Sequence, residues 1–303
     1  LPENDEVGLF GDVKGAVIKN LELDNAGIVG RDYTGCIVGS ADKSSFYNIK
    51  CSVNLTGDDF TGGIAGKTYS GIFSGCSISG TITGDFCVGG LSGSAFMANI
   101  EDAISGCTIY CGSFSGGLIG EFDGRGYKII RSASECNIYA TGTYIGGITG
   151  YIARAQISES FSKGLIEGGS YLGGIIGWSD ESTHISDCYS MTDIEYSYSD
   201  GFGTGGFSGC LDPWSDVKNS YSTGSVRKND GTGYGLGFSG CIYSLDDIIN
   251  CYWDTDTSGT VYSQGGEGRT TAEMINPDYD STYVSWDFVN TWQIDPLLNG
   301  GYP

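Results

Sequence analysis

A cluster of glycines around one large apolar residue recurs nine times along the chain. The clusters are VGLFG, GCIVG, GGIAG, GGLSG, GGLIG, GGITG, GGIIG, GGFSG and LGFSG, and their last glycines are Gly11, Gly39, Gly66, Gly93, Gly120, Gly150, Gly177, Gly209 and Gly240. Successive clusters are separated by 28, 27, 27, 27, 30, 27, 32 and 31 residues. A period of this length indicates stacked copies of one supersecondary unit, and it constrains the fold more than any other feature.

Three positions relative to the last glycine of each cluster have a fixed character. Three residues before it stands a glycine in eight repeats, with Cys36 as the exception. Two residues before it stands a large apolar residue in all nine: Leu9, Ile37, Ile64, Leu91, Leu118, Ile148, Ile175, Phe207 and Phe238. Six residues before it stands an aromatic residue in six: Tyr33, Phe60, Phe114, Tyr144, Tyr171 and Tyr234. We expect a stack of aromatic rings, and glycines that allow either positive φ at a corner or close approach of the next coil.

The remainder of each repeat has the pattern of short strands. Alternating apolar runs such as ISGCTI and ISDCY, separated by Gly, Asn, Asp and Ser, predict strands of three to six residues. A unit of about 27 residues fits one coil of a β-solenoid better than a propeller blade of about 40. We predict an all-β solenoid, or β-helix, of about nine coils over residues 1–265. A blade or sandwich architecture is the alternative.

The two ends of the chain differ in their sequence. Residues 266–303 break the period, TTAE at 270–273 fits a capping box that opens a short helix, and SWDFVNTWQI supplies aromatic side chains to cover the last coil. We therefore predict a short irregular C-terminal cap over 266–303. The N-terminal segment LPENDEVGLFG reaches the first cluster without a comparable cap.

The nine clusters resemble the GLUG-motif repeat family. The tail, with CYWDTDTSG, GGEGRTTAEM and WDFVNTWQIDPLLNGGYP, is similar to the usual ending of such arrays, so the resemblance covers essentially the whole chain. Proteins with these repeats are typically secreted or surface-attached, and include adhesin-like proteins and the non-catalytic parts of IgA-cleaving metalloproteases. The resemblance implies an extracellular scaffold and brings no catalytic residue with it.

Charge and hydropathy exclude several classes of partner. The chain has 37 acidic against 15 basic residues, a net charge of −22, which disfavours binding to nucleic acid or anionic headgroups. No stretch has the roughly 18 to 20 apolar residues that span a bilayer, so we expect no membrane insertion. The chain begins at Leu1 without an initiator Met or signal peptide, which suggests a processed or excised chain.

Eleven cysteines are unusual for a cytosolic protein, and their odd number leaves at least one thiol free or intermolecular. We place six in one column of the second strand signal, where Leu21, Ser160 and Ser220 stand in other repeats: Cys51, Cys76, Cys107, Cys136, Cys188 and Cys251. Stacked cysteines have Cα atoms within disulfide range, but their parallel Cβ vectors favour a reduced internal ladder over bridges within it.

Four cysteines are disulfide candidates. Cys210 and Cys241 follow the last glycine of consecutive repeats, in a column that we interpret as the start of an exposed turn, and we predict a bridge between them. Cys87 and Cys111 lie outside the ladder and are candidates for a bridge to each other or to another subunit. No pair has the CxxC spacing of a zinc site.

Two short motifs raise the question of metal binding and modification. DTDTSG, with Asp254, Asp256 and Ser258, matches the first half of an EF-hand calcium loop, but Gly265 stands where a bidentate Glu is needed. A turn explains the string equally well, so calcium is a weak candidate and no other cofactor is expected. The single sequon, at Asn54, is a candidate glycosylation site.

The residues do not assemble into a recognisable catalytic set. His184 is the only histidine and falls on a predicted turn, so no Ser-His-Asp set can be argued. β-Helices can carry polysaccharide lyases and hydrolases that use acidic residues in a groove, but no pair of carboxylates stands out here. We expect no enzymatic activity and keep a lyase or hydrolase as a remote alternative.

We predict an extracellular structural protein whose subunits associate with one another, head to tail or laterally, into a filament, sheath or surface layer. The acidic, rod-shaped chain and its uncapped first coil motivate this hypothesis. The alternative is an adhesive or glycan-binding stalk module of a larger surface protein, with exposed tyrosines contacting surface glycans.

Overall fold

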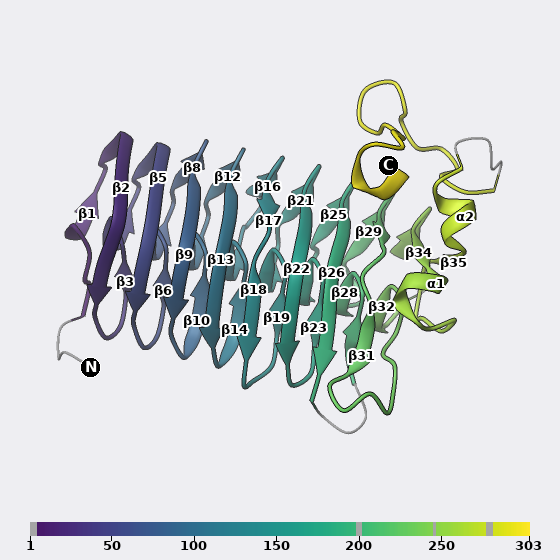
Figure 1. Ribbon diagram of the computed structural model, residues 1–303. Coiled ribbons are helices and arrows are strands. Elements are labelled where there is room, and N and C mark those ends of the chain that lie inside the picture. The colour runs from purple at the N-terminus through teal and green to yellow at the C-terminus, as the bar shows by residue number, and fades with distance from the viewer. Residues whose placement is uncertain (1–4, 198–201, 245–246, 277–280) are drawn as a thin grey trace.

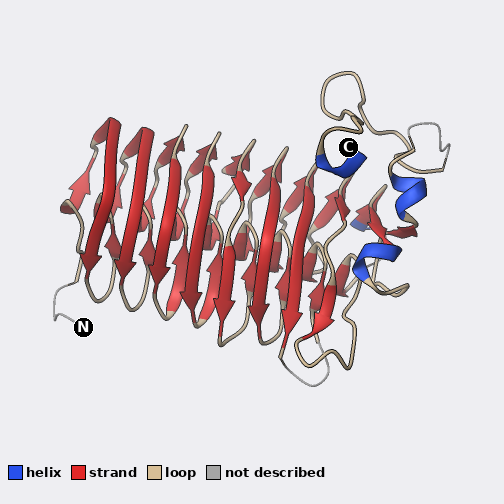
Figure 2. Ribbon diagram, viewed as in Figure 1, coloured by secondary structure: helices blue, strands red, loops and turns tan. Residues whose placement is uncertain are grey.

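The chain folds into a parallel β-solenoid of about 8 turns, which confirms the predicted fold class (Figures 1 and 2). The computed structural model describes residues 5–197, 202–244, 247–276 and 281–303. Each coil passes through three sheets, here called B, C and A in chain order, and the named strands pair in parallel with their equivalents in neighbouring coils. The N-terminal coil lies at one end of the stack and the C-terminal segment at the other (Figure 1).

Sheets A and B are formed by the strands on either side of the glycine clusters. Sheet B contains nine strands: β1 (Phe10–Lys14), β4 (Val38–Asp42), β7 (Ala65–Tyr69), β11 (Ser92–Phe96), β15 (Ile119–Asp123), β20 (Thr149–Ala153), β24 (Ile176–Asp180), β28 (Ser208–Leu211) and β32 (Ser239–Ile242). Sheet A contains seven: β3 (Thr34–Gly35), β6 (Thr61–Gly62), β10 (Phe86–Gly89), β14 (Ser113–Gly116), β19 (Ile145–Gly146), β23 (Leu172–Gly173) and β27 (Thr204–Gly205). Nine clusters give about 8 turns, because among the described residues no regular strand of sheet A directly precedes the first or the last cluster.

Sheet C carries the second strand signal of each repeat, often split in two. Its strands are β2 (Val17–Val29), β5 (Ser45–Thr56), β8 (Ile72–Ser74), β9 (Ser77–Thr83), β12 (Asn99–Glu101), β13 (Ile104–Cys111), β16 (Lys128–Ile130), β17 (Ala133–Ser134), β18 (Asn137–Ala140), β21 (Gln156–Ser158), β22 (Phe161–Gly168), β25 (His184–Ser186), β26 (Tyr189–Tyr196), β29 (Asp216–Lys218), β30 (Tyr221–Ser222), β31 (Val226–Lys228), β33 (Ile248–Ile249), β34 (Tyr252–Asp254) and β35 (Glu267–Arg269).

The apolar column two residues before each last glycine forms the centre of the core. From Ile37 to Phe238 its eight members are fully buried, whereas Leu9 in the first coil is 54% exposed. In sheet C, alternating residues point inward, as the burial of Phe46, Ile49 and Val53 along β5 shows. The core is thus a stack of like residues, one layer for each coil.

The glycines of the clusters are required for close approach and not for positive φ. A Cβ on Gly66 would lie 2.3 Å from the carbonyl carbon of Tyr33 in the coil before, and a Cβ on Gly63 would lie 2.1 Å from the Gly90 oxygen in the coil after. Neither glycine has positive φ. Of the two roles predicted for these glycines, close packing between backbones is therefore the one observed.

The left-handed conformation occurs instead at bends occupied by residues with side chains. One column of positive φ runs between sheets C and A: Glu6, Tyr33, Phe60, Cys87, Phe114, Tyr144 and Tyr171. A second column lies within sheet C: Asn20, Asn48, Asp102, Arg131, Glu159, Asp187, Asn219 and Asn250, with Gly75 in the same position. Each such residue costs roughly 1 kcal/mol, so the stacking of neighbouring coils must stabilise the bends.

The aromatic column six residues before the last glycine forms a continuous stack, as expected. Ring centroids are 5.1 Å apart for Tyr33 and Phe60 and 5.0 Å apart for Tyr144 and Tyr171. Where Cys87 interrupts the column, the adjacent Phe86 supplies the ring, at 4.8 Å from Phe114. The stack continues from Tyr171 to Phe202, whereas the predicted member Tyr234 is exposed and pairs with Arg227 in an antiparallel bridge.

The last coil is covered by residues 260–269, which run along it. The Gly237 N–H donates to the Tyr262 carbonyl oxygen at 2.9 Å, and the Gln264 N–H donates to Ser239 at 3.1 Å. β35 pairs with β34, so parallel pairing extends beyond the predicted boundary at residue 265. Three short helices follow the coil: α1 (Thr255–Ser258), α2 (Thr271–Met274) and η2 (Asn299–Gly301). The predicted capping box at α2 is present, with Thr270 and Glu273 bonded reciprocally.

The final segment packs against the side of the solenoid. The sequence had led us to expect it over the last coil instead. The ring centroids of Trp286 and Trp292 lie 6.2 and 5.9 Å from the ring centroid of Tyr221. Tyr221 belongs to an outer column of sheet C together with Tyr189 and Tyr252. The Tyr221 hydroxyl donates to the Pro303 carbonyl oxygen at 2.6 Å. The segment therefore clamps three coils together laterally, next to β29 (Figure 1).

Substitution of a cluster glycine should destabilise the fold far more than substitution of a strand glycine with open space. Gly63→Ala places a Cβ against the backbone of the next coil and should lower the free energy of unfolding by about 3 kcal/mol. Gly106→Ala is the matched control, because nothing lies within 4 Å of its Cβ. Urea unfolding followed by circular dichroism measures both. Equal stability of the two variants would contradict the close-approach explanation.

Candidate functional site

The first coil is an open end of the solenoid. In the described part of the chain, β1 pairs only with β4 and β2 pairs only with β5, so each presents one unpaired backbone edge. Leu9, Phe10, Val17 and Val29 are 46–64% exposed. A long edge strand with exposed apolar residues is a template for pairing with another chain.

The open end is hollow where a further coil would place its core. A cavity of about 440 Å³ is lined by apolar residues, among them Val7, Leu23, Ile28 and Val29. β2 also carries an irregularity between Leu23 and Ala26, where its register against β5 shifts. The edge therefore offers three stretches, 17–19, 21–23 and 26–29, separated by the left-handed bend at Asn20 and by the bulge.

The six cysteines of the predicted internal ladder are all buried thiols, but they do not form one column. Cys76, Cys188 and Cys251 share a position with Ser160 and Ser220, as neighbouring pairs in the register show. Relative to the position of Cys76 in its coil, Cys51 lies two residues later, opposite Ile78. Cys107 lies four residues later than that same position, opposite Gly80. Cys136 is bonded through its sulfur to the Cys107 N–H at 3.3 Å. Because alternate residues of a strand face the core, shifts of two or four residues preserve burial and escape detection in the sequence.

Burial makes the Cys76 and Cys111 thiols unreactive. It raises the pKa of Cys76 to about 11 and that of Cys111 to about 12. The thiolate is the reactive form, so these groups are protonated and inert near neutral pH. The described cysteines other than Cys210 and Cys241 are free.

Cys210 and Cys241 form the predicted disulfide. They are direct neighbours in the parallel register of β28 and β32, with Cα atoms 4.4 Å apart. Their column lies on sheet B and includes Ser40, Lys67 and Trp178, so the interpretation of this position as a turn is wrong. The bridge ties the last two coils together.

Cys87 and Cys111 are not bridged to each other in the structure. Cys87 occupies the aromatic column at a bend, and its sulfur lies 3.8 Å from a Glu121 carboxylate oxygen. Cys111 ends β13, and its sulfur lies 3.9 Å from the Tyr139 carbonyl oxygen. Both thiols are buried, and separate local contacts stand in place of the candidate bridge between them.

The DTDTSG segment forms a turn whose oxygens are engaged by the chain itself. The buried Asp254 carboxylate accepts from the N–H groups of Asp256 and Thr257 and caps α1. Its other oxygen accepts from the hydroxyls of Thr271 and Tyr302, both at 2.6 Å. Ser258 is buried and donates to the Thr260 carbonyl oxygen. These bonds account for the motif without a calcium ion.

Asn54 and His184 both lie on strands. Asn54 is exposed in the middle of β5, between Gly27 and Thr81 of the neighbouring coils. His184 begins β25, where a turn was expected, and its Nδ1 is bonded to Asp216, which also pairs with Lys218 at 3.1 Å. These side chains form a polar row on the surface that is contributed by adjacent coils.

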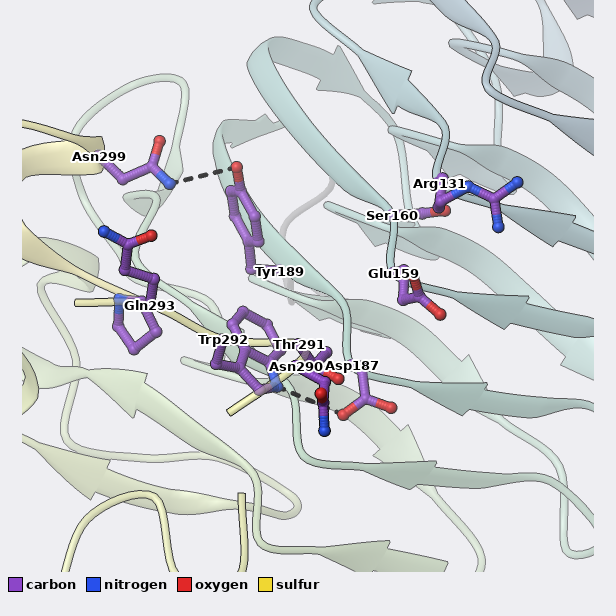
Figure 3. A pocket seen from close by; sticks show the side chains of 11 residues that line it. Arg131, Glu159, Ser160, Asp187, Tyr189, Asn290, Thr291, Trp292, Gln293 and Asn299 are labelled. Carbon is purple, nitrogen blue, oxygen red and sulfur yellow. Dashed lines mark hydrogen bonds between the residues drawn. The ribbon is translucent and has the colours of Figure 1, made fainter. Parts of the chain in front are cut away.

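Two polar groupings escaped sequence reasoning. Asp58, Asp59 and Asp85 are close enough to share a cation, and burial together with the neighbouring carboxylates raises the pKa of Asp59. Separately, Arg131, Glu159 and Asp187 line a cavity with Trp292 (Figure 3). The recurrence of Asn and Asp at the sheet C bend is a sequence signal for the second grouping, because these residues favour positive φ. The contact between this grouping and the C-terminal segment has no local signal in the sequence.

Thiol counting tests the single bridge. Alkylation of the unfolded protein should label nine cysteines without reductant and eleven with it. In Cys210→Ser, ten cysteines should be labelled under both conditions. Mass spectrometry gives the counts, and labelling of all eleven without reductant would exclude the bridge.

Removal of the Asp254 carboxylate should loosen the C-terminal segment. Asp254→Ala leaves four donors without their acceptor, among them the buried Tyr302 hydroxyl, and should cost about 3 kcal/mol of unfolding free energy. Asp256→Ala, at an exposed neighbour, should cost less than about 1 kcal/mol. Thermal unfolding measures both, with and without excess calcium. A calcium-dependent rise in the wild-type melting temperature that Asp254→Ala abolishes would instead support an ion at this turn.

Two comparisons with known proteins leave the chain without a match. Neither the models of protein families nor the curated proteins give one. Among the described residues, no helix has the length and apolar character needed to cross a membrane.

Proposed function

We propose that this chain is a non-enzymatic structural module of an extracellular surface assembly, and that its first coil pairs with the first coil of a second copy. The observation that carries the proposal is the difference between the two ends. Residues 260–269 cover the last coil, whereas the backbone edges of β1 and β2 and the apolar hollow beside them are exposed.

The arrangement of the ends favours head-to-head over head-to-tail association. A head-to-tail contact would place the first coil on the last, where residues 260–269 already occupy the backbone groups. A two-fold axis through sheet C instead places β2 antiparallel to β2 of the second copy, a self-complementary contact. Longer filaments, sheaths or layers then require an additional lateral contact.

Charges along β2 suit this pairing. Lys19 and Glu22 are both exposed and flank Asn20 and Leu21 in the first half of β2. When two copies of β2 run antiparallel about the midpoint between Asn20 and Leu21, Lys19 of one copy faces Glu22 of the other, and opposite charges across strands stabilise pairing. The same contact removes exposed apolar side chains such as Leu9 from water.

Two features support an extracellular location. A disulfide joins Cys210 and Cys241, and such bonds persist in oxidising compartments. The repeats also resemble those of secreted and surface-attached GLUG-motif proteins. Cell fractionation with an antibody to the folded chain tests the location directly.

A charge placed in the first coil should abolish association. Leu9→Glu should weaken the self-association constant at least tenfold, because a carboxylate would be buried without a partner in the contact. Leu297→Glu is the control, since Leu297 is an exposed apolar residue of the C-terminal segment. Sedimentation velocity over a range of concentrations, with electron microscopy of the particles, measures association. A wild type that stays monomeric at high concentration, or an equal effect of both substitutions, would refute the proposal.

A further inference from the structure

A polar cavity lies between the outer face of sheet C and the C-terminal segment, far from the first coil (Figures 1 and 3). Its volume is about 290 Å³, near the lower limit of small-molecule pockets. One wall comes from the solenoid and the other from residues 290–293 and 299, so the cavity exists only because the final segment folds back.

The solenoid wall presents three charged residues from consecutive coils. Arg131, Glu159 and Asp187 are successive members of the left-handed column in sheet C, with φ of 48°, 49° and 54°. Parallel stacking therefore sets these side chains in a row. Arg131 is held by Asp102, its Nε donating to a carboxylate oxygen at 2.8 Å. In the described part of the chain, the exposed Glu159 carboxylate has no hydrogen-bond donor, so its oxygens are available.

Trp292 of the opposite wall and Tyr189 of β26 together form an aromatic side of the cavity that is fixed in place. The Trp292 indole Nε1–H donates to Asp187 Oδ1 at 3.3 Å. The Asn299 side-chain nitrogen donates to the Tyr189 hydroxyl at 3.3 Å, and the Lys163 ammonium donates to the Asn299 side-chain oxygen at 3.0 Å. Figure 3 shows Trp292 and Tyr189 across the cavity from Arg131 and Glu159. The wall is therefore organised before any ligand enters.

We propose that this cavity binds a neutral saccharide, as one or two sugar rings. The cavity offers acceptors in Glu159 and in Asp187, which Trp292 holds in place, and donors in Arg131 and the amides of Asn290 and Gln293. Hydroxyl groups both donate and accept, so a polyol can satisfy both kinds of group at once. The indole and phenol edges provide the apolar surface against which a sugar ring packs.

Other ligand classes fit the same groups less well. An anion would meet two carboxylates on a protein of net charge −22. An organic cation would meet the Arg131 guanidinium in the same row. A metal ion would need three close acidic or histidine ligands, and among the described residues those groups come together only at Asp58, Asp59 and Asp85.

Nuclear magnetic resonance of the full chain tests the proposal. The probes are the methyl glycosides of glucose, galactose and N-acetylglucosamine and the corresponding disaccharides, with methyl glucuronide as the anionic comparison. Five tryptophans give five indole N–H signals, and Trp292→Phe identifies that of Trp292. We expect at least one neutral sugar to shift the Trp292 signal saturably, and to leave those of Trp178 and Trp214 unchanged.

Two matched variants separate recognition from stability. Glu159→Gln removes an acceptor charge with little change of shape and should weaken binding by roughly tenfold. Glu167→Gln makes the same change in the same coil outside the cavity and should bind like the wild type. The proposal is wrong if no neutral sugar shifts the Trp292 signal, if methyl glucuronide binds more tightly than every neutral sugar, or if Glu159→Gln binds unchanged. Because the cavity is remote from Leu9, Leu9→Glu should leave sugar binding intact, which separates this outcome from failure of the assembly proposal.

Discussion

The whole molecule depends on the parallel backbone ladder between coils, which holds each residue over its equivalent about 4.8 Å away. That spacing turns a repeated sequence position into a column of like side chains in contact. Stacked rings such as Tyr33 and Phe60, and the buried column from Ile37 to Phe238, follow from it. The same spacing makes the glycines of the clusters necessary, because neighbouring backbones approach too closely there for a Cβ.

Much of the fold could be predicted because the ladder acts directly on the repeat. The core column, the aromatic stack, the disulfide between Cys210 and Cys241 and the capping box at Thr270 each follow from a position counted along the chain. The cysteine ladder was misjudged because inward-facing positions recur every two residues. A count from the cluster cannot distinguish registers that differ by two or four residues.

The candidate sites were less predictable because they arise outside the repeat. The cavity beside Trp292 depends on a return of the chain across about 100 residues of sequence, and no periodic pattern encodes such a contact. The open first coil was predicted, but our proposal of head-to-head pairing rests on the hydrogen bonds that residues 260–269 make with the last coil, which the sequence does not show. Asp254 shows the converse case, in which a metal-like motif serves to anchor the chain's own hydroxyls.

The left-handed bends of sheet C have a consequence for how such a protein can diversify. Because Asn, Asp, Arg and Glu all adopt the bend, the backbone path does not depend on which of them is present. A substitution there changes the outer surface of one coil and leaves the layers beneath it in place. The row of bends is therefore a set of interchangeable positions, along which new recognition groups can be introduced coil by coil on an unchanged framework.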